Sequence, residues 1–470
     1  MVYIFIIAPA HVQRKREVQM SRSKEMDLTT GNPFWSLLKF AIPVILGNLF
    51  QLFYTLADSV IVGKTLGADA LAAVGATSVI VYFELCFIQG FTGGFGILLG
   101  QAFGERSKKK MEQSVSASWV LSIGFTILLT LILSLLAHPI IGWMNTPEDI
   151  YDRAYIYLLI IFLGTGATVL YNMISNMLRA LGDSKTPLYF LIFSSLLNIG
   201  LDILFIVPFG WGVAGAAIAT VAAQLLSGVF CVIVAAKKFE VMRLGRRLLA
   251  IEKNPLIAHL KIGFPMGFQM SVMCIGQLAM QAAVNHIGTS AIAGYTAATK
   301  VDQLAILVNN AVGIAIASYV AQNFGARQWK RIRVGVKDCF LMLTVLNIFM
   351  GVLLLAGKGL VVPMFVNNPT KDIIYYSDTF LWTVVPFYIL LGAVSVYRTT
   401  IQSMGNAWAP FGACIIELVA RVTCAMFVSV YFGYRAVCFS TPFAWMTSLC
   451  LLIPVYFIIE CGRMKEYEQR

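Results

Sequence analysis

Four polar side chains inside apolar stretches are the residues of this sequence best suited to ion chemistry. Asp58 lies near the end of one stretch, Asn198 and Asp202 stand one helical turn apart in another, and Thr220 lies about seven residues into a third. Two carboxylates with an amide oxygen and a hydroxyl provide ligands for a small hard cation, and two carboxylates at close range share a proton. We therefore predict a site for Na⁺ or H⁺; the alternative is that each aspartate is solvated independently near a helix end.

The composition indicates that these residues belong to a membrane protein. Of the 470 residues, 59% are hydrophobic and 12% are charged, and the mean hydropathy is +0.78, whereas about a quarter of the residues of soluble domains are charged. A water-soluble globule is thereby excluded. The formal charge of +12 comes from basic residues in loops between apolar segments, which argues against nucleic acid as a partner and predicts the lipid bilayer instead. The nine cysteines are scattered singly and are interpreted as packing residues.

Twelve apolar segments are long enough to cross a bilayer as helices, which takes about 20 residues. They cover residues 37–63, 78–103, 115–141, 157–181, 187–208, 213–236, 257–285, 292–324, 336–357, 375–403, 410–432 and 437–460. Lys and Arg gather in the loops that follow the even-numbered segments. This bias predicts that those loops and both termini lie in the cytoplasm and that the chain is a multi-pass protein of the cell membrane.

A repeat relates the two halves of the chain. The Gln-x-Phe-Gly motif at Gln101 recurs at Gln322, an offset of 221 residues, and Pro43 recurs as Pro265 at an offset of 222. These prolines are expected to bend their helices. Because each half has six segments, both halves begin on the same side of the membrane and the repeat is parallel.

We therefore expect an all-α polytopic membrane protein of twelve helices in two parallel six-helix lobes. The expected division is a cytoplasmic N-terminal segment 1–36, a first lobe 37–236, a cytoplasmic linker 237–256, a second lobe 257–460 and a cytoplasmic tail 461–470.

The repeat also argues that the carboxylates are functional. At ~1.5 Å per residue, the four polar residues fall at a similar depth, roughly 10–15 Å below the outer surface. Asp58 corresponds to Met280 in the second half, and Asp202 corresponds to Ala425. Structural residues tend to survive duplication in both halves, so carboxylates present in one half favour a functional role. An ionisable group inside a bilayer costs roughly 2.5 to 3.5 kcal/mol and therefore needs an explanation.

Other polar residues of the segments are candidates for a substrate cavity or gate between the lobes. The set consists of Gln51, Tyr54, Glu84, Gln269, Lys300, Asp302, Glu417 and Arg421. Glu417 and Arg421 lie one turn apart and can pair with each other, which favours a structural ion pair over a substrate contact. Lys300, Asp302 and Glu84 either line the cavity or face interfacial water, and both readings stay open.

Catalytic motifs are missing from the sequence. It contains no His-Glu-x-x-His, no Gly-x-Ser-x-Gly and no phosphate-binding Gly-x-x-x-x-Gly-Lys-Ser/Thr, and its four histidines lie near the ends of segments or outside them. We therefore expect neither an enzyme nor a cofactor. Transport would be driven by an ion gradient, unless a separate energising subunit exists.

Several short motifs, taken in their order and spacing, resemble the multidrug and toxic compound extrusion (MATE) family. They are Pro43, 47–51, 57–63, 66–75, 101–104, 179–183 and 198–202. The resemblance implies export of drugs or organic cations coupled to inward Na⁺ or H⁺. It also implies that Asp58, Asn198, Asp202 and Thr220 form a cation site in the first lobe. Some branches have an acidic residue eight positions after the second proline, where this sequence has Met273. We add Met273 to the cavity candidates and expect coupling to rest on the first lobe alone.

The sequence thus predicts a monomeric secondary active antiporter that exports drugs or other small, often cationic, organic compounds. In alternating access, one lobe rocks against the other around a cavity between them. One alternative is a flippase for lipid-linked sugars, which would need a cationic cavity for a pyrophosphate. Another is a channel or sensor, which needs no ion exchange. Flux against a gradient separates these classes.

Overall fold

The computed structural model describes residues 26–144, 146–243, 252–365 and 369–468. Over these ranges the chain is helical and contains no strand. Helices suit a bilayer because each backbone N–H and C=O is satisfied within its own segment. Eleven helices are long and apolar enough to cross a membrane, and the number is twelve when one bent pair counts as a single span. The predicted all-α polytopic fold is confirmed; most of the predicted N-terminal segment and part of the predicted linker lie outside the described residues.

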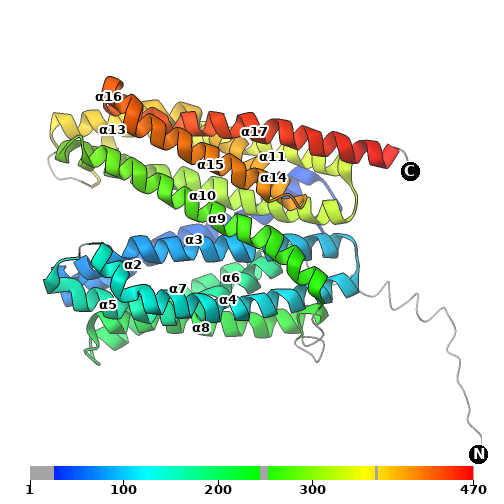
Figure 1. Ribbon diagram of the computed structural model, residues 1–470, viewed down its shortest axis with the longest axis horizontal. Coiled ribbons are helices and arrows are strands. Elements are labelled where there is room, and N and C mark those ends of the chain that lie inside the picture. Colours follow the sequence, from blue (N-terminus) through cyan, green and yellow to red (C-terminus); the bar gives the residue numbers. More distant parts are fainter. Residues whose placement is uncertain (1–25, 145, 244–251, 366–368, 469–470) are drawn as a thin grey trace, which may run out of the picture.

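The helices form two lobes, which lie one above the other in Figure 1. The first lobe contains α2 (Pro33–Leu66), α3 (Ala68–Gly104), α4 (Lys108–Trp143), α5 (Glu148–Leu163), α6 (Thr165–Ala180), α7 (Lys185–Ile206) and α8 (Gly212–Lys238). The second lobe contains α9 (Lys253–Asn285), α10 (Thr289–Gly325), α11 (Trp329–Ala356), α12 (Lys358–Val361), α13 (Lys371–Val384), α14 (Tyr388–Ser403), α15 (Trp408–Thr423), α16 (Ser429–Phe432) and α17 (Tyr434–Glu468). The basic loops after α3, α8 and α10 share one end of the bundle, on the right in Figure 1. We call it the basic end and the other the opposite end.

The fourth span of each lobe is broken, which the sequence did not predict. The predicted segment 157–181 is instead the bent pair α5 and α6, which meet at 45° at Gly164 and begin at Glu148. A Cβ on Gly164 would overlap the Val221 side chain of α8, so the break lies where the backbone approaches its neighbour closely. In the second lobe, α13 and α14 are separated by a 3₁₀ turn that contains Pro386, 222 residues after Gly164. By contrast, α2 and α9 remain continuous helices through Pro43 and Pro265.

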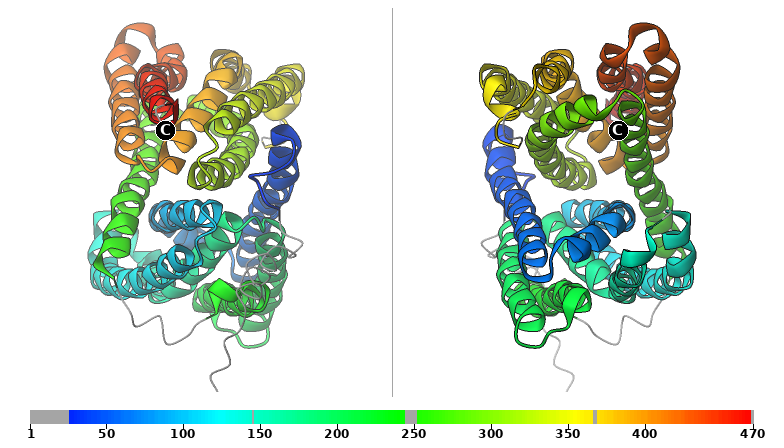
Figure 2. Two further views of the ribbon diagram at one scale, coloured as in Figure 1. Left: turned by 90° about the vertical axis from the view of Figure 1, so that its right-hand side faces the viewer. Right: turned by 90° about the vertical axis from the view of Figure 1, so that its left-hand side faces the viewer.

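The first helix of each lobe crosses toward the other lobe (Figure 2). α2 begins in the hydrophobic core of the second lobe, where Leu37 and Phe40 are buried, and ends in the first lobe, where Val62 joins a different cluster. α9 makes the reverse crossing. The helix begins against α3 and α4 of the first lobe and ends against α15 of the second lobe. At its start, a His259 ring nitrogen lies 3.0 Å from the Ser114 hydroxyl of α4. The two lobes are therefore joined by two helices that the repeat relates to each other.

The two lobes meet most closely near the basic end. Gly104 of α3 packs on the backbone carbonyl of Gln322, and Gly325 of α10 packs on the backbone carbonyl of Gln101, so closely that a Cβ at either glycine would overlap the carbonyl. We call these four residues the seam. Toward the opposite end the ribbons of the lobes diverge (Figure 1).

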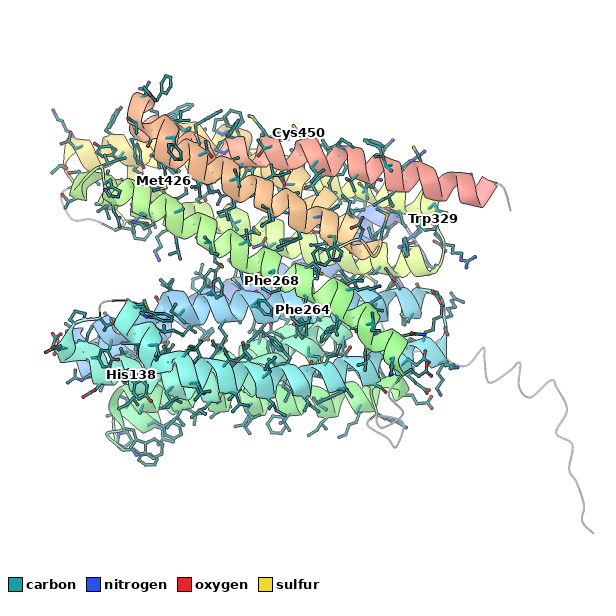
Figure 3. The ribbon with its side chains drawn as sticks, in the orientation of Figure 1. His138, Phe264, Phe268, Trp329, Met426 and Cys450 are labelled. Carbon is teal, nitrogen blue, oxygen red and sulfur yellow. The ribbon has the colours of Figure 1, made fainter. Side chains whose placement is uncertain are left out.

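Aromatic contacts extend the junction toward the middle of the bundle. Phe264 and Phe268 of α9 lie where this helix passes over the first lobe (Figure 3). The Phe268 ring centroid lies 5.2 Å from that of Phe87, and the Phe264 centroid lies 5.2 Å from that of Phe91.

Candidate functional site

Asp58 of α2 and Asp202 of α7 face each other inside the first lobe. Their carboxyl groups lie within hydrogen-bonding distance, close enough to share a proton. The two helices pack side by side, and Gly47 of α2 lies against the Leu191 side chain of α7. Asp202 is fully buried. The structure therefore brings together the two carboxylates that the sequence singled out.

The oxygen atoms of this cluster lack hydrogen-bond donors. Among the described residues, no donor reaches Asp58 Oδ1, Asn198 Oδ1 or either carboxylate oxygen of Asp202, and all four atoms are buried. Asn198 uses its amide nitrogen to donate to Thr220 Oγ1 at 3.3 Å, which leaves its carbonyl oxygen free. Buried oxygens without donors are costly unless a proton or a cation compensates them. The donor set, two carboxylates, an amide and a hydroxyl, fits either.

Two tyrosines adjoin the carboxylate pair. Tyr54 of α2, a predicted cavity residue, and Tyr157 of α5 both interact electrostatically with Asp58 and Asp202. Tyr54 also hydrogen-bonds to Gln224 of α8. The sequence reasoning missed Tyr157, because nothing in its spacing relates the start of the fourth span to α2 and α7.

The matching positions of the second lobe are packed with apolar groups. Met280 and Ala425, the counterparts of Asp58 and Asp202, are 2% and 1% exposed and belong to the hydrophobic core of that lobe. The Ser440 hydroxyl contacts the Met280 sulfur at 2.6 Å. The second lobe therefore has no carboxylates at the positions that match Asp58 and Asp202 with which to form an equivalent cation site.

The second lobe instead holds a network of paired charges. Glu417 of α15 accepts hydrogen bonds from Arg421 at 3.2 Å and from Arg398 of α14. Tyr388 donates to Asp302, which also interacts electrostatically with Arg421. The predicted pairing of Glu417 with Arg421 is confirmed. The sequence reasoning missed Arg398, although a charged residue inside an apolar segment was a signal that could have found it.

The remaining cavity candidates have diverse surroundings. Glu84 is buried inside the first lobe, where it accepts a hydrogen bond from Thr165 at 2.6 Å, so it does not face interfacial water. Gln269 accepts from Gln402 at 2.7 Å inside the second lobe. The Met273 sulfur lies 3.6 Å from an Arg398 nitrogen. Of the other cavity candidates, the Gln51 side chain is half-buried and the Lys300 side chain is exposed.

Two related hydrogen bonds join the lobes at the seam. Gln101 of the first lobe donates through Nε2 to the Ser403 carbonyl of the second lobe at 2.8 Å. Gln322 of the second lobe donates through Nε2 to the Ala180 carbonyl of the first lobe, also at 2.8 Å. The repeated glutamines thus make the same contact in opposite directions, each with the end of the other lobe's fourth span.

The residues before α2 cross the basic end as a strap, which we define as residues 26–31. The backbone N–H of Leu28 donates to Gln322 Oε1 at 3.0 Å, and the Arg331 guanidinium donates to three strap carbonyls at 2.6 to 3.3 Å. On the first-lobe side, Gly182 packs on the Met26 carbonyl. The strap therefore contacts both lobes beside the seam. Its residues had been predicted only as part of a cytoplasmic segment.

Comparisons with known proteins agree in family and fold. A family model described as MatE matches residues 43–204 and 265–427, more than half of the chain. The probable multidrug resistance protein YpnP of Bacillus subtilis (strain 168) is 31% identical over 455 residues, which cover 95% of this chain and 100% of that protein. A FAD transporter of Shewanella oneidensis is 22% identical over 439 residues, 90% of this chain and 94% of that protein. A solved outward-facing multidrug resistance MATE family transporter of the MOP superfamily superposes with a TM-score of 0.87 at 21% identity, covering 94% and 99% of the two chains.

Proposed function

This chain belongs to the MatE family, and we propose that it is a secondary active antiporter that exports small organic compounds in exchange for Na⁺ or H⁺. As a member of that family it is a multi-pass membrane transporter and not an enzyme. The observation that carries the proposal is the buried cluster of oxygens without donors at Asp58, Asn198 and Asp202. Such a cluster changes its free energy strongly when a proton or cation binds, which is what a coupling site requires.

Coupling works through α2 in this proposal. The helix carries Asp58 in the first lobe and inserts its other half into the core of the second lobe. Loading of the carboxylate pair removes the repulsion between Asp58 and Asp202 and lets α2 and α7 pack more closely. A ligand shifts such an equilibrium only by its differential affinity for the two states. Each charge that moves inward across 100 mV contributes about 2.3 kcal/mol, enough to concentrate a substrate roughly fiftyfold.

We place the basic end in the cytoplasm of a cell-membrane protein that acts as a monomer. The positive-inside bias of the loops supports this orientation. The state described is then outward-facing, because the lobes are joined at the basic end and diverge at the opposite end. The cargo is a drug or a similar small compound, by analogy with the relative named as a multidrug resistance protein. The relative named as a FAD transporter suggests that cargo in this family need not be cationic.

Efflux from proteoliposomes under an imposed Na⁺ or pH gradient tests the proposal. Asp58→Asn and Asp202→Asn should each abolish gradient-driven efflux, because the neutral amide no longer responds to a proton or cation. Asp69→Asn is the matched control, since it makes the same charge change on a side chain that is 71% exposed. Normal pumping by both Asp58→Asn and Asp202→Asn would show that the coupling site lies elsewhere.

A lipid-linked sugar flippase is the less favoured function. It would need a cationic cavity for a pyrophosphate, whereas the two deep arginines of the second lobe, Arg398 and Arg421, both pair with Glu417. A channel would carry the test compound only down its gradient, so uphill efflux from the same proteoliposomes excludes it.

A further inference from the structure

One face of α10 contacts the first lobe at the basic end. At the basic end this face carries Ala321, which lies 3.0 Å from a Cβ built on Gly100 of α3, and Gly325, which packs on Gln101. An α-helix turns by about 100° per residue. Four polar residues nearer the opposite end, at 296, 300, 303 and 310, therefore lie within about 60° of Ala321 around the helix axis. They are Thr296, Lys300, Gln303 and Asn310, which we call the polar stripe.

The polar stripe is exposed, although the same face is buried at the basic end. All four of its side chains are exposed, whereas Ala321 and Gly325 are buried. Because the stripe continues the face that contacts the first lobe at the basic end, we infer that it faces the first lobe where the ribbons of the lobes diverge. Lys300 lies eleven residues from the start of α10 at Thr289, about 16 Å along the helix. A charged side chain at that depth is stable where it reaches a water-filled space.

The charge of Lys300 is not compensated by the network behind it. Within the second lobe, two guanidinium groups and two carboxyl groups, those of Arg398, Arg421, Glu417 and Asp302, interact with one another. Among the described residues, Lys300 itself forms no ion pair with a carboxylate. The stripe therefore presents one free positive charge among three neutral hydrogen-bonding side chains.

The facing helix of the first lobe is apolar or aromatic opposite Lys300 and Gln303, and polar at Gln89, which corresponds to Asn310. With the repeat offset of 221 residues, Lys300 corresponds to Val79 of α3, and Gln303 corresponds to Tyr82. Val79 and Tyr82 are 38% and 50% exposed, and the neighbouring Phe83 is 38% exposed. Around Lys300, the first-lobe side is thus aromatic and aliphatic, while the second-lobe side is polar and cationic.

We propose that the polar stripe on α10, centred on Lys300, binds the anionic group of an amphipathic organic anion or zwitterion, whose rings pack on Val79, Tyr82 and Phe83. This proposal deepens the proposed function, on which it rests, by naming the substrate class: a compound with a carboxylate or phosphate beside an apolar body. A cation is disfavoured at this wall, so this proposal differs from the expectation that the cargo is often cationic. The anionic headgroup of a bilayer lipid has the same chemistry and is the competing source of the ligand.

Binding of two xanthene dyes of similar size and opposite charge tests this assignment. The dissociation constants of fluorescein and rhodamine 123 are measured by fluorescence polarisation on the purified full-length protein in nanodiscs of phosphatidylcholine. The wild type should bind fluorescein more tightly. Lys300→Gln should weaken fluorescein binding about fivefold to tenfold, as expected for one partly hydrated charge pair, and should leave rhodamine 123 binding equal or tighter. Lys300→Arg should stay within about twofold of the wild type, since it keeps the charge.

The controls separate a site from a general charge effect. Lys64→Gln removes the same charge from an exposed lysine in the last turn of α2 and should change neither dissociation constant. Unchanged fluorescein binding in Lys300→Gln, or preferential binding of rhodamine 123 by the wild type, overturns the proposal. Nanodiscs with phosphatidylglycerol provide the lipid arm. If this lipid suppresses fluorescein binding in the wild type and not in Lys300→Gln, the stripe holds a headgroup and the substrate assignment is wrong.

The outcome is independent of ion coupling, because no gradient is imposed. If Asp58→Asn abolishes efflux and keeps the charge preference of binding, both proposals hold. If binding follows Lys300 while efflux ignores the Na⁺ and pH gradients, the proposed function fails and the stripe assignment stands.

Discussion

Replacement of Gln322 by leucine should favour the state in which the basic end opens. The side chain is fully buried and makes two hydrogen bonds, donating to the Ala180 carbonyl of the first lobe and accepting from the Leu28 N–H of the strap. Leucine keeps most of the volume and removes both bonds. In the arrangement that is closed at the basic end, the carbonyl and the N–H stay buried without partners, whereas water satisfies them once the lobes part at that end.

The magnitude follows from the number of groups left unpaired. Each buried donor or acceptor without a partner costs about 1–3 kcal/mol. With some relaxation of the seam, the lower part of the range applies, and Gln322→Leu should shift the equilibrium between the two states by about 2–3 kcal/mol, or roughly 30-fold to 150-fold. Gln101→Leu is the matched control. Gln101 is half-buried and its side chain makes one hydrogen bond, to the Ser403 carbonyl. Loss of this bond should shift the equilibrium between the two states by about half the free energy expected for Gln322→Leu, or roughly tenfold.

Distances between spin labels across the basic end measure this shift. Lys109 and Lys330 are exposed residues of different lobes beside the seam, and labels are placed there after the exposed Cys450 and Cys461 are replaced. Double electron–electron resonance should show a larger population at long distance in Gln322→Leu than in Gln101→Leu. Gly325→Leu, whose side chain would overlap the Gln101 carbonyl, is the positive control. Equal populations in the two glutamine variants, or a larger shift in Gln101→Leu, would contradict this account of the seam.

Three further predictions concern the strap, the junction of α3 with α9 and the buried carboxyl of Asp183. Arg331→Gln removes a guanidinium that donates to three strap carbonyls and should increase protease cleavage of the strap severalfold, with no change in the unfolding temperature of the rest of the protein. The Cys86 and Cys274 thiols lie within hydrogen-bonding distance across the junction of α3 and α9, so oxidation with copper phenanthroline should form a disulfide that stops efflux until a reductant is added, and Cys86→Ser should be insensitive. Burial opposes ionisation of Asp183, but hydrogen bonds from Lys238 and a neighbouring threonine hold the pKa of this carboxyl below its usual range. Its stabilisation is therefore complete at neutral pH and is lost as the pH falls below about 4, so Asp183→Asn should cost about 1 kcal/mol in thermal unfolding at pH 7 and nothing in strong acid.

Depth along a spanning helix was the most informative quantity in the sequence. Counting residues from segment ends placed Asp58 and Asp202 at one level, and the structure brings their carboxyl groups together. Spacing within one helix also predicted the contact of Glu417 with Arg421. Both inferences use the fixed rise and turn of a helix, which the sequence alone supplies.

Contacts between helices distant in the chain could not be predicted in this way. Arg398 meets Glu417 because α14 and α15 pack side by side, and rotation about the helix axes decides that contact. The break in the fourth span was missed for a related reason. Gly164 interrupts the helix where Val221 of α8 approaches it, and no rule that applies to a single segment relates these two residues. The helix propensity of a segment depends on its own residues, whereas close packing depends on the residues of two segments at once.

One continuous piece of chain connects the carboxylate pair with the contacts that close the basic end. The strap is bonded to Gln322 through Leu28, α2 follows and buries Phe40 in the core of the second lobe, and Asp58 lies further along the same helix. A rigid helix transmits a shift at one end to the other without a relay of side chains. Any movement of α2 that accompanies loading of Asp58 therefore acts directly on the seam. If the proposed ion binding at the carboxylate pair is coupled to the seam in this way, reciprocity requires that a change which loosens the seam alter the affinity for the ion by the same factor. In the proposed mechanism the asymmetry of the two lobes has a physical reason: α9 makes the same crossing in reverse but carries Met280 in place of the aspartate, so ion binding would pull on one of the two crossing helices and leave the other as a passive hinge.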